Sequence, residues 1–376
     1  MNFNFDDKIN NFLKIILKNA LKLDYRVFFV GGIVRDKILN VPTYDIDLLL
    51  MGNAIEFSQS LPSEINVKSV HSDFGTVKLE YCGVEIDIAS SRAEIYPNSG
   101  CLPVVDKIGV EIQEDVLRRD FTVNSLYCKL KVVNDEVKYE LIDLVDGVKD
   151  IKNKTLRVLH AKSYIDDPTR ILRGVGFKYR FGFEFSECDN LLIKEYLSNI
   201  KYDNMSYDRN IKVLKYVLSS NFQDEVFTEI VEKKYYKIIN HDDLEVNLEY
   251  VFDVCKKFNL DFEQKKQFYI SILLNNAVEK KSFKTILDIY KYFIKFNFNE
   301  LVYYFYKTKD KNVFEFIKIR DIKLNINGDD LIQLGFKQGR QIGEILDKIL
   351  LRKLEKPSFF TNKQDEMTWI KNNFLN

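Results

Sequence analysis

The sequence lacks several features that mark whole classes of protein. It has no net charge, because Lys+Arg and Asp+Glu each number 56; this excludes a uniformly basic coat for nucleic acid but allows a local basic patch. Glycine (15) and proline (6) are too scarce for a low-complexity or disordered chain. The five cysteines include no CxxC pair. A disulfide framework or a structural zinc site is therefore disfavoured, and a reducing compartment fits best.

Long hydrophobic runs are also missing. The apolar stretch at 27–34 is far shorter than the roughly 20 residues that span a bilayer. The N-terminus does not pair a basic region with an apolar one, as a signal peptide would. We therefore expect a soluble, cytoplasmic protein without a membrane partner. With 46% apolar residues in 376, the chain has ample core and is too long for one ordinary domain.

The character of the chain changes near residue 150, which predicts an α+β protein. Before that point, short β-branched runs predict strands of a mixed sheet at 26–32, 45–52, 75–81 and 83–90, with helices near 8–20, 34–39 and 53–60. After it, apolar residues at i, i+3, i+4 and i+7 predict helices, for example at 206–218 and 283–296. An amphipathic helix is expected to open near Gly343, and residues 331–376 carry a net charge of +3. The remainder is predicted to be all-helical.

The strongest local motif is FVGGIVRD at 29–36, in which a strand, two glycines and a helix follow one another. Gly31 and Gly32 would let backbone N–H groups approach an anion at the helix N-terminus, which suits a triphosphate. Arg35 could add a charge-assisted contact to the same phosphates. The alternative is a plain tight turn.

Two aspartates follow on the next predicted strand. Asp45 and Asp47 are two residues apart, so both carboxylates would project from one face. Such a pair suits Mg²⁺ ions that activate a 3′-hydroxyl and hold a triphosphate for in-line attack. Asp87, on the alternating strand at 83–89, could supply a third carboxylate. Solvent-facing polar strand faces are the alternative, and for Asp87 the two readings are nearly balanced.

Two further segments carry charged groups at close spacing. In the first, the arginines at 118 and 119 can grip phosphates, while Asp120 and Asn124 can bond a ribose hydroxyl; a salt-bridged helix end is the alternative. In the second, Asp167 precedes Pro168 and would cap a helix. Asp167 and Arg170 would also share one helix face.

An Asp/Arg pair can select a base without a template. A carboxylate accepts from an exocyclic amino group, and the guanidinium donates to the adjacent ring nitrogen. Cytosine and adenine present that pattern, whereas guanine and uracil present its reverse. A mismatch leaves polar groups unpaired, which provides discrimination of a few kcal/mol.

Taken in order, these segments resemble the class II tRNA nucleotidyltransferase and bacterial poly(A) polymerase family. The matching phrases are GGIVRD at 31–36, DID at 45–47, RRDFTVNSL at 118–126, LIDLVDGVKDIKNKTLRVLH at 141–160 and DDPTRILR at 166–173, and the C-terminal phrase at 327–346 is also similar. Three departures stand out, two of them at single positions; the third is the neck phrase at 206–209, which keeps Arg209 but lacks the acidic residue often found downstream. Asp166 replaces the usual Glu, and Gly176 stands where members commonly carry Arg.

The resemblance implies a palm-type head at 1–150, a neck with the base-reading motif at 151–218, a body at 219–310 and a tRNA-binding tail at 311–376. It implies transfer of nucleotides from CTP and ATP to the 3′ end of tRNA with Mg²⁺, the acceptor and TΨC arms being bound by shape and phosphate contacts. By position, Asp45 and Asp47 resemble the metal ligands. The nucleotide contacts would be Gly31, Gly32, Arg35, Arg119, Asp120, Asn124, Asp167, Arg170 and Arg173. Arg92, Glu94 and Tyr96 fall in the family's flexible loop, at 92–103.

Three activities remain open from the sequence. The first is building or repair of the complete CCA end. The second is a partial activity, A-adding, CC-adding or poly(A) polymerisation, to which the phrases around Asp47 and Tyr96 bear some similarity. The third is a non-catalytic RNA-binding module, which predicts loss of an acidic residue at 45 or 47, and both are present. The oligomeric state is not predicted.

Overall fold

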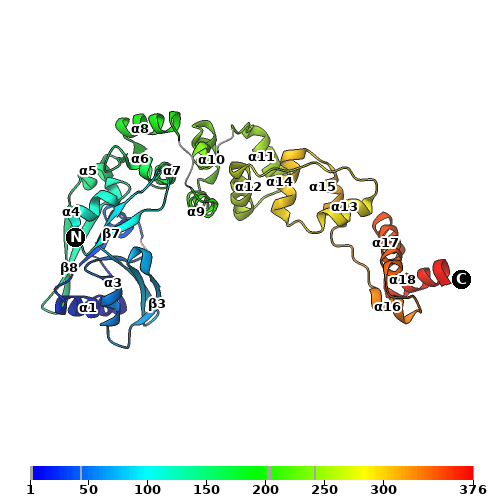
Figure 1. The fold of residues 1–376 in the computed structure, drawn as a ribbon, viewed down its shortest axis with the longest axis horizontal. Coiled ribbons are helices and arrows are strands. Elements are labelled where there is room, and N and C mark those ends of the chain that lie inside the picture. Colours follow the sequence, from blue (N-terminus) through cyan, green and yellow to red (C-terminus); the bar gives the residue numbers. More distant parts are fainter. Residues whose placement is uncertain (1–2, 43–44, 201–204, 241–242, 376) are drawn as a thin grey trace. The chain divides into compact units, whose positions relative to one another are not determined.

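In the computed structural model of the chain, the described residues are 3–42, 45–200, 205–240 and 243–375. The chain divides into two compact units, Met1–Leu244 and Glu245–Asn376 (Figure 1). Each unit has its own core of buried apolar residues. Among the described residues, no helix is both long and apolar enough to cross a membrane.

A seven-stranded mixed sheet forms the base of the first unit, in the order β3-β4-β5-β2-β1-β8-β9. The neighbours β2 and β5 are parallel, and the other pairs in the sheet are antiparallel. The predicted strands and the mixed sheet are confirmed. The strands are β1 (Arg26–Val30), β2 (Asp47–Met51), β3 (Asn66–His71), β4 (Thr76–Tyr81), β5 (Val84–Ser90), β8 (Leu126–Val133) and β9 (Glu136–Asp143).

Three predicted helices of the head are also confirmed: α1 (Asp7–Lys22), α2 (Gly32–Leu39) and α3 (Ala54–Gln59). Helix α1 begins where the Asp6 carboxylate accepts a hydrogen bond from the Ile9 N–H at 2.9 Å. It buries Phe12 and Ile16, which are four residues apart, against the sheet. The period of the apolar residues thus fixes which face of α1 meets the sheet.

The remainder of the first unit is mostly helical. Its helices are α4 (Ile112–Asp115), α5 (Gly147–Lys152), α6 (Ser163–Asp166), α7 (Thr169–Phe181), α8 (Glu187–Ser198), α9 (Tyr207–Val217) and α10 (Gln223–Glu232), and a separate ribbon pairs β6 (Arg92–Ile95) with β7 (Val104–Ile108). The prediction of an all-helical remainder needs one correction. A short parallel pair, β10 (Thr155–Leu156) and β11 (Glu184–Phe185), follows residue 150. This pair places the Phe185 ring against Gly174 of α7, where a Cβ would meet the ring at 2.4 Å.

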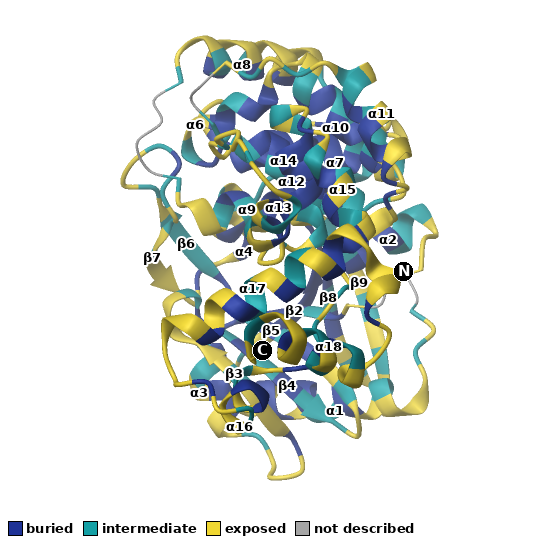
Figure 2. Ribbon diagram, turned by 90° about the vertical axis from the view of Figure 1, so that its right-hand side faces the viewer, coloured by how far each residue is buried: buried dark blue, intermediate teal, exposed yellow. Residues whose placement is uncertain are grey.

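In the second unit, the described residues form helices and no strand. Its helices are α11 (Leu248–Lys257), α12 (Phe262–Leu274), α13 (Ile286–Phe293), α14 (Phe298–Thr308), α15 (Asn312–Ile319), α16 (Gly328–Gln333), α17 (Arg340–Glu355) and α18 (Lys363–Ile370). Buried and exposed residues alternate along α17, so that one face of the helix is buried (Figure 2). This helix begins at Arg340, so the predicted start near Gly343 was wrong. Gly339, with φ 143°, precedes the first turn and Gly343 lies within the helix.

A buried ion pair holds the end of the second unit together. The Glu366 carboxylate is fully buried and accepts from Lys353 Nζ at 2.6 Å and from the backbone N–H groups of Asn325 and Ile326. Around it packs an apolar cluster that includes Leu331 and Ile349. The buried charge of the Glu366 carboxylate is therefore balanced by a cation and by backbone hydrogen bonds, as a buried charge requires.

Candidate active site

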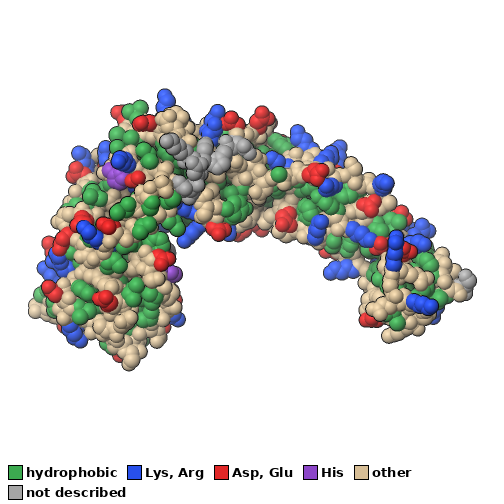
Figure 3. Space-filling view, in the orientation of Figure 1, with side chains coloured by type: hydrophobic (Ala, Val, Ile, Leu, Met, Phe, Trp, Pro, Cys, Tyr) green, Lys and Arg blue, Asp and Glu red, His purple; other side chains and the backbone are tan. Residues whose placement is uncertain are grey.

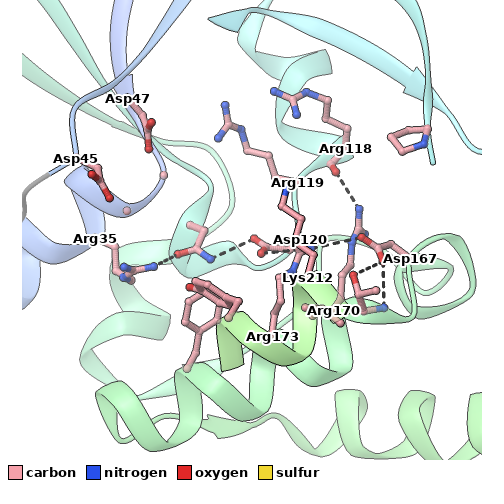
Figure 4. A pocket seen from close by; sticks show the side chains of 18 of the residues that line it. Arg35, Asp45, Asp47, Arg118, Arg119, Asp120, Asp167, Arg170, Arg173 and Lys212 are labelled. Carbon is pink, nitrogen blue, oxygen red and sulfur yellow. Dashed lines mark hydrogen bonds and ion pairs between the residues drawn. The ribbon is translucent and has the colours of Figure 1, made fainter. Parts of the chain in front are cut away.

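A pocket of about 920 Å³ in the first unit gathers the predicted residues (Figure 4). Every predicted site residue except Asp87 lines it, although the residues come from segments as far apart as 31 and 173 in the sequence. The predicted lining residues are Gly31, Gly32, Arg35, Asp45, Asp47, Arg92, Glu94, Tyr96, Arg119, Asp120, Asn124, Asp167, Arg170 and Arg173. Arg118, Arg180, Arg209, Lys212 and Tyr216 join them.

The glycine turn lies at the N-terminus of α2. Gly31 has φ 68°, a conformation that side chains with a Cβ adopt only with strain, and it caps the helix. A Cβ built at Gly31 would meet nothing within 4 Å, so the space in front of the turn is open. The helix N-terminus thus presents unpaired N–H groups to the pocket, which is the arrangement that binds phosphate.

The acidic pair follows on the neighbouring strand. Asp47 is the first residue of β2, whereas Asp45 precedes the strand, which corrects the prediction that both lie on it. Figure 4 nevertheless shows the Asp45 and Asp47 carboxylates next to each other on one side of the pocket. Burial, together with the nearby charges of Asp87 and Asp45, raises the pKa of Asp47. Like charges gathered in one place are stabilised by a bound cation.

Asp87 is in register with Asp47 on the parallel strand β5. Its carboxylate lies 3.1 Å from Lys78 Nζ and is half-exposed. Within the described residues, no group of three or more His, Cys, Asp or Glu side chains could hold a metal ion by itself. Two carboxylates still fit a divalent cation of the Mg²⁺ type, because such ions usually combine one or two protein carboxylates with substrate phosphates and water. Asp45 and Asp47 therefore suit a metal that arrives with a triphosphate.

A buried carboxylate, Asp115, organises the arginines above the acidic pair. It is fully buried and accepts from Arg118 Nη2 at 2.7 Å, Arg119 Nη2 at 2.7 Å and the Tyr127 hydroxyl at 2.8 Å. Burial opposes the charge of Asp115, but Arg119 and Arg118 outweigh it and hold the pKa of this carboxyl well below its usual range. The predicted alternative, a salt-bridged helix end, describes Arg118 and Arg119 correctly, and both still line the pocket.

Three polar side chains of the pocket, those of Arg35, Asn124 and Asp120, are joined by hydrogen bonds. Arg35 is buried, donates to the Asp36 carboxylate at 2.6 Å and to Asn124 Oδ1, and lies over the Phe177 and Phe181 rings. Asn124 Nδ2 in turn donates to Asp120 Oδ1 at 3.2 Å. Arg35 is thus held by these contacts and connects the head to α7; its predicted contact with phosphate stays a prediction.

Asp167 stands at the start of α7. One of its oxygens, Oδ1, accepts from the Thr169 N–H at 3.0 Å, from the Thr169 hydroxyl, and from Arg209 Nη2 at 2.7 Å. The other, Oδ2, has Arg173 Nη2 at 3.5 Å. Burial would raise the pKa of Asp167, but Arg173 and Arg209 outweigh it and lower the pKa. The carboxylate bonds the N–H of the first helical residue, as a capping side chain does, but α7 begins at Thr169 with Pro168 as its N-cap, so the predicted N-cap position is wrong by one residue.

Arg170 is 2% exposed, yet part of its guanidinium has no hydrogen-bond partner among the described residues. Its Nη2 donates to the Arg118 carbonyl at 2.9 Å and to the Tyr96 hydroxyl at 3.3 Å. Its Nε and Nη1 are buried without an acceptor in the structure. Unpaired buried donors are costly. A ligand in this pocket that offers acceptors to Arg170 would remove that cost.

The segment at 92–103 is partly strand. Arg92 and Glu94 belong to β6, and the Glu94 carboxylate accepts from Arg92 Nε at 2.7 Å. Residues 96–103 connect β6 to β7 and lie against the start of α7, where Tyr96 meets Arg170. The part of the segment that contacts the base-reading motif is therefore this connection.

The two departures at single positions have different surroundings. Asp166 is not among the pocket-lining residues, and its carboxylate lies 3.9 Å from His160 Nε2. Gly176 faces α9, and a Cβ there would meet Val217 Cγ1 at 3.4 Å. A long side chain at Gly176 would push the two helices apart, so glycine at this position goes with their close packing.

Two residues with clear roles were given none from the sequence: Asp115, which pairs with two pocket arginines, and Arg209, which lines the pocket. Asp115 could have been found, because it stands three and four residues before the two arginines, the spacing of helical ion pairs. Arg209 lies in the neck phrase at 206–209, which keeps an arginine of the family pattern, but its partners cannot be read from that phrase. It meets Asp167 and the carbonyls of Gly100 and Cys101 only through the tertiary fold.

Comparison with known proteins identifies the class of this site. Residues 27–157 match the model of the poly(A) polymerase head domain, which spans the sheet and the arginine segment just described. The structure of a CCA-adding enzyme in complex with ATP has a TM-score of 0.69 at 25% identity, covering 99% of this chain and 97% of that one. Within the first unit, residues 27–157 thus form a head domain of the poly(A) polymerase type.

Sequence comparison finds relatives that are similar to most of this chain. An A-adding tRNA nucleotidyltransferase from Geobacter sulfurreducens is 28% identical over 92% of this chain and 45% of its own length. A CCA-adding enzyme from Streptococcus agalactiae is 27% identical over 89% of this chain and 90% of its own length. The chain spans less than half the length of the A-adding relatives it matches. The chain is thus similar to tRNA nucleotidyltransferases over most of its length, as its sequence motifs predict.

Proposed function

We propose that this chain adds or repairs the 3′-terminal CCA of tRNA, taking nucleotides from CTP and ATP without a nucleic-acid template. The observation that carries this proposal is the convergence, in one pocket, of three parts: a phosphate-binding turn at Gly31, a carboxylate pair at 45 and 47, and the Asp167/Arg170 pair. Each part serves one requirement of nucleotide transfer, namely the triphosphate, the metal and the base.

In the proposed reaction the RNA 3′-oxygen attacks the α-phosphorus of the nucleotide. A new O–P bond forms, and the bond to the departing pyrophosphate breaks. Asp45 and Asp47 would hold Mg²⁺, which supplies activation of the 3′-hydroxyl and neutralises charge on the phosphates. The N–H groups at Gly31 and Gly32 would bind the triphosphate at the helix N-terminus. Arg119, which Asp115 fixes, lies close enough to Asp47 to oppose the rise in that carboxyl's pKa, and so suits a phosphate contact.

Base selection would rest on unused hydrogen-bonding capacity. Among the residues that the structure describes, Oδ1 of Asp167 already has three donors, whereas Oδ2 has only the Arg173 contact at 3.5 Å. Oδ2 can therefore accept from an amino group. Arg170 Nε and Nη1 still need acceptors, which a ring nitrogen or a carbonyl of the base can supply. An acceptor beside unsatisfied donors favours cytosine and adenine over guanine and uracil.

We further propose that the second unit contributes to tRNA binding. Residues 331–376 carry a net charge of +3 and include Arg340, which is highly exposed on α17. Over the face seen in Figure 3, cationic and anionic side chains are interspersed on both units. Scattered cations suit contacts to a phosphate backbone that depend on shape rather than on base sequence. The activity would be cytoplasmic, where tRNA is made and repaired.

The second candidate is addition of the terminal A alone. It is favoured by the names of three relatives, which are A-adding tRNA nucleotidyltransferases, at 28 to 38% identity. The Asp167/Arg170 pair accepts both bases and does not separate the two candidates. The order of addition must therefore be read from products.

Three synthetic tRNAs test the proposal: one ending at the discriminator base, one after C and one after CC. Each is offered CTP, ATP or both, with Mg²⁺, and the products are resolved to single nucleotides. Completion of all three to CCA, followed by a stop, is expected. Extension of only the CC-ending tRNA with ATP would replace CCA addition by A addition. Long tails on unrelated RNA would make the chain a poly(A) polymerase, and no incorporation would overturn the proposal.

A further inference from the structure

The connection between β6 and β7 is bound to the base-reading motif at several points. The Gly100 N–H donates to the Asp166 carbonyl at 3.3 Å, and the Ser99 hydroxyl donates to the Ile165 carbonyl at 2.7 Å. Tyr96 meets Arg170, as described above. Gly100 itself has φ 75°, and a Cβ there would meet Met205 Cγ at 3.0 Å. The fit of this connection against the motif therefore depends on a glycine.

Arg209 of α9 joins the connection to the base-reading carboxylate. Its Nη2 pairs with Asp167 Oδ1 at 2.7 Å. Its Nη1 donates to the Gly100 carbonyl at 2.6 Å and to the Cys101 carbonyl at 3.1 Å. One planar guanidinium thus bridges two groups that are 66 and 67 residues apart in sequence, and its side chain is only 16% exposed. The largely buried guanidinium of Arg209 is therefore held by a carboxylate on one side and by two backbone carbonyls on the other.

We propose that Arg209 is a positioning residue for base selection: it keeps Oδ1 of Asp167 occupied, so that Oδ2 faces the incoming base, and it ties that carboxylate to the 96–101 connection. The inference rests on the proposed function and deepens it. Loss of Arg209 removes the charged one of three donors to Oδ1 and leaves the N–H and hydroxyl of Thr169 to hold that oxygen, so the carboxylate is fixed less firmly. The same loss releases the carbonyls at 100 and 101. Selectivity and docking of the connection should therefore change together.

The shape of the arginine is part of the inference. A guanidinium presents several N–H donors in a rigid fork, whereas the lysine ammonium is a point charge on a flexible chain. Arg209→Lys keeps the charge and can pair with Asp167 or with the carbonyls, but does not span both in this geometry. We therefore expect Arg209→Lys to be intermediate and Arg209→Gln to show the full effect.

The test measures two properties of the full-length chain. The first is the ratio of kcat/KM for ATP to that for UTP and GTP, on the tRNA that the wild-type protein extends with A. The second is the rate at which Cys101, a partly exposed thiol within the connection, reacts with an alkylating reagent, followed by mass spectrometry of its peptide. Lys215→Gln is the matched control, because it removes one charge from the same helix at an exposed position outside the pocket.

For Arg209→Gln we expect selectivity to fall by about tenfold or more and Cys101 to react several-fold faster, with a smaller change in both for Arg209→Lys and none for Lys215→Gln. Wild-type selectivity in a folded, active Arg209→Gln protein overturns the inference, and so does a loss of selectivity without faster reaction of Cys101. If Arg209→Gln does not fold, Arg209→Lys alone decides between the same outcomes. Failure of the wild-type protein to incorporate any nucleotide would instead contradict the proposed function.

Discussion

Asp115→Asn removes the charge that holds two pocket arginines. The wild-type carboxylate is fully buried and bonds Arg118 and Arg119, whose side chains are 15% and 11% exposed. Asparagine keeps the size of the side chain but removes the carboxylate that pairs with both guanidiniums, and Arg118 keeps only the more distant Glu94 carboxylate at 3.5 Å. Breaking a buried ion pair in this way costs about 3–5 kcal/mol. Part of that cost falls on the pocket, because Arg119 lines it next to the acidic pair.

The assay is urea unfolding followed by far-UV circular dichroism, together with the KM for ATP. We expect the free energy of unfolding to fall by about 3–5 kcal/mol and KM to rise. Glu114→Gln is the control, since it makes the same chemical change at the adjacent, exposed position and should leave both values unchanged. A loss below about 1 kcal/mol, the range of a surface ion pair, would refute the reasoning from burial.

The pH dependence gives an independent check. The arginines hold the pKa of Asp115 well below its usual range in the folded protein, whereas an unfolded aspartate titrates near a pKa of about 3.9. A lowered folded pKa means that the stabilisation is present above the unfolded pKa and is lost as the pH falls toward the folded value. The difference in stability between wild type and Asp115→Asn should therefore shrink as the pH falls below about 4. A difference that is constant down to the lowest accessible pH would contradict this assignment.

Three further changes have defined outcomes. Arg170→Ala should lower kcat/KM for both CTP and ATP and let UTP and GTP compete better, by about tenfold or more in competition assays; unchanged selectivity would leave Asp167 as a helix cap only. Gly31→Ala should cost roughly 1–2 kcal/mol, because φ is 68° there, and raise the KM for ATP; an unaltered KM would remove the turn from the triphosphate site. Glu366→Gln should destabilise the second unit by about 3–5 kcal/mol, read from the fluorescence of Trp369, which packs beside Phe360; an unshifted transition would contradict the buried pair with Lys353.

The fold of the head could be predicted from the sequence because its strands and helices carry clear periods. β5 alternates buried Ile86 and Ile88 with polar residues, and α1 buries Phe12 and Ile16 on one face. Helix starts were less predictable. The sequence predicts that α17 begins near Gly343, but Gly339, with its positive φ, precedes the first turn of this helix.

The composition of the pocket could be predicted, but the contacts within it could not. Motif spacing selected its residues, all but Asp87 of which converge on one cavity. Which donor meets which acceptor depends on tertiary packing. Arg35 pairs with Asn124, which is 89 residues away, and Arg209 reaches Gly100, which is 109 residues away. No local pattern encodes such contacts.

The central claim is that Asp45 and Asp47 hold the metal for nucleotide transfer in this pocket. It is tested most directly by single-turnover incorporation of ATP and CTP onto 3′-truncated tRNA by wild type, Asp45→Ala and Asp47→Ala, with tRNA binding and melting temperature measured alongside. We expect Mg²⁺-dependent incorporation by wild type and none by either variant, while tRNA binding and melting temperature stay near the wild-type values. Incorporation by either variant at the wild-type rate would contradict the claim.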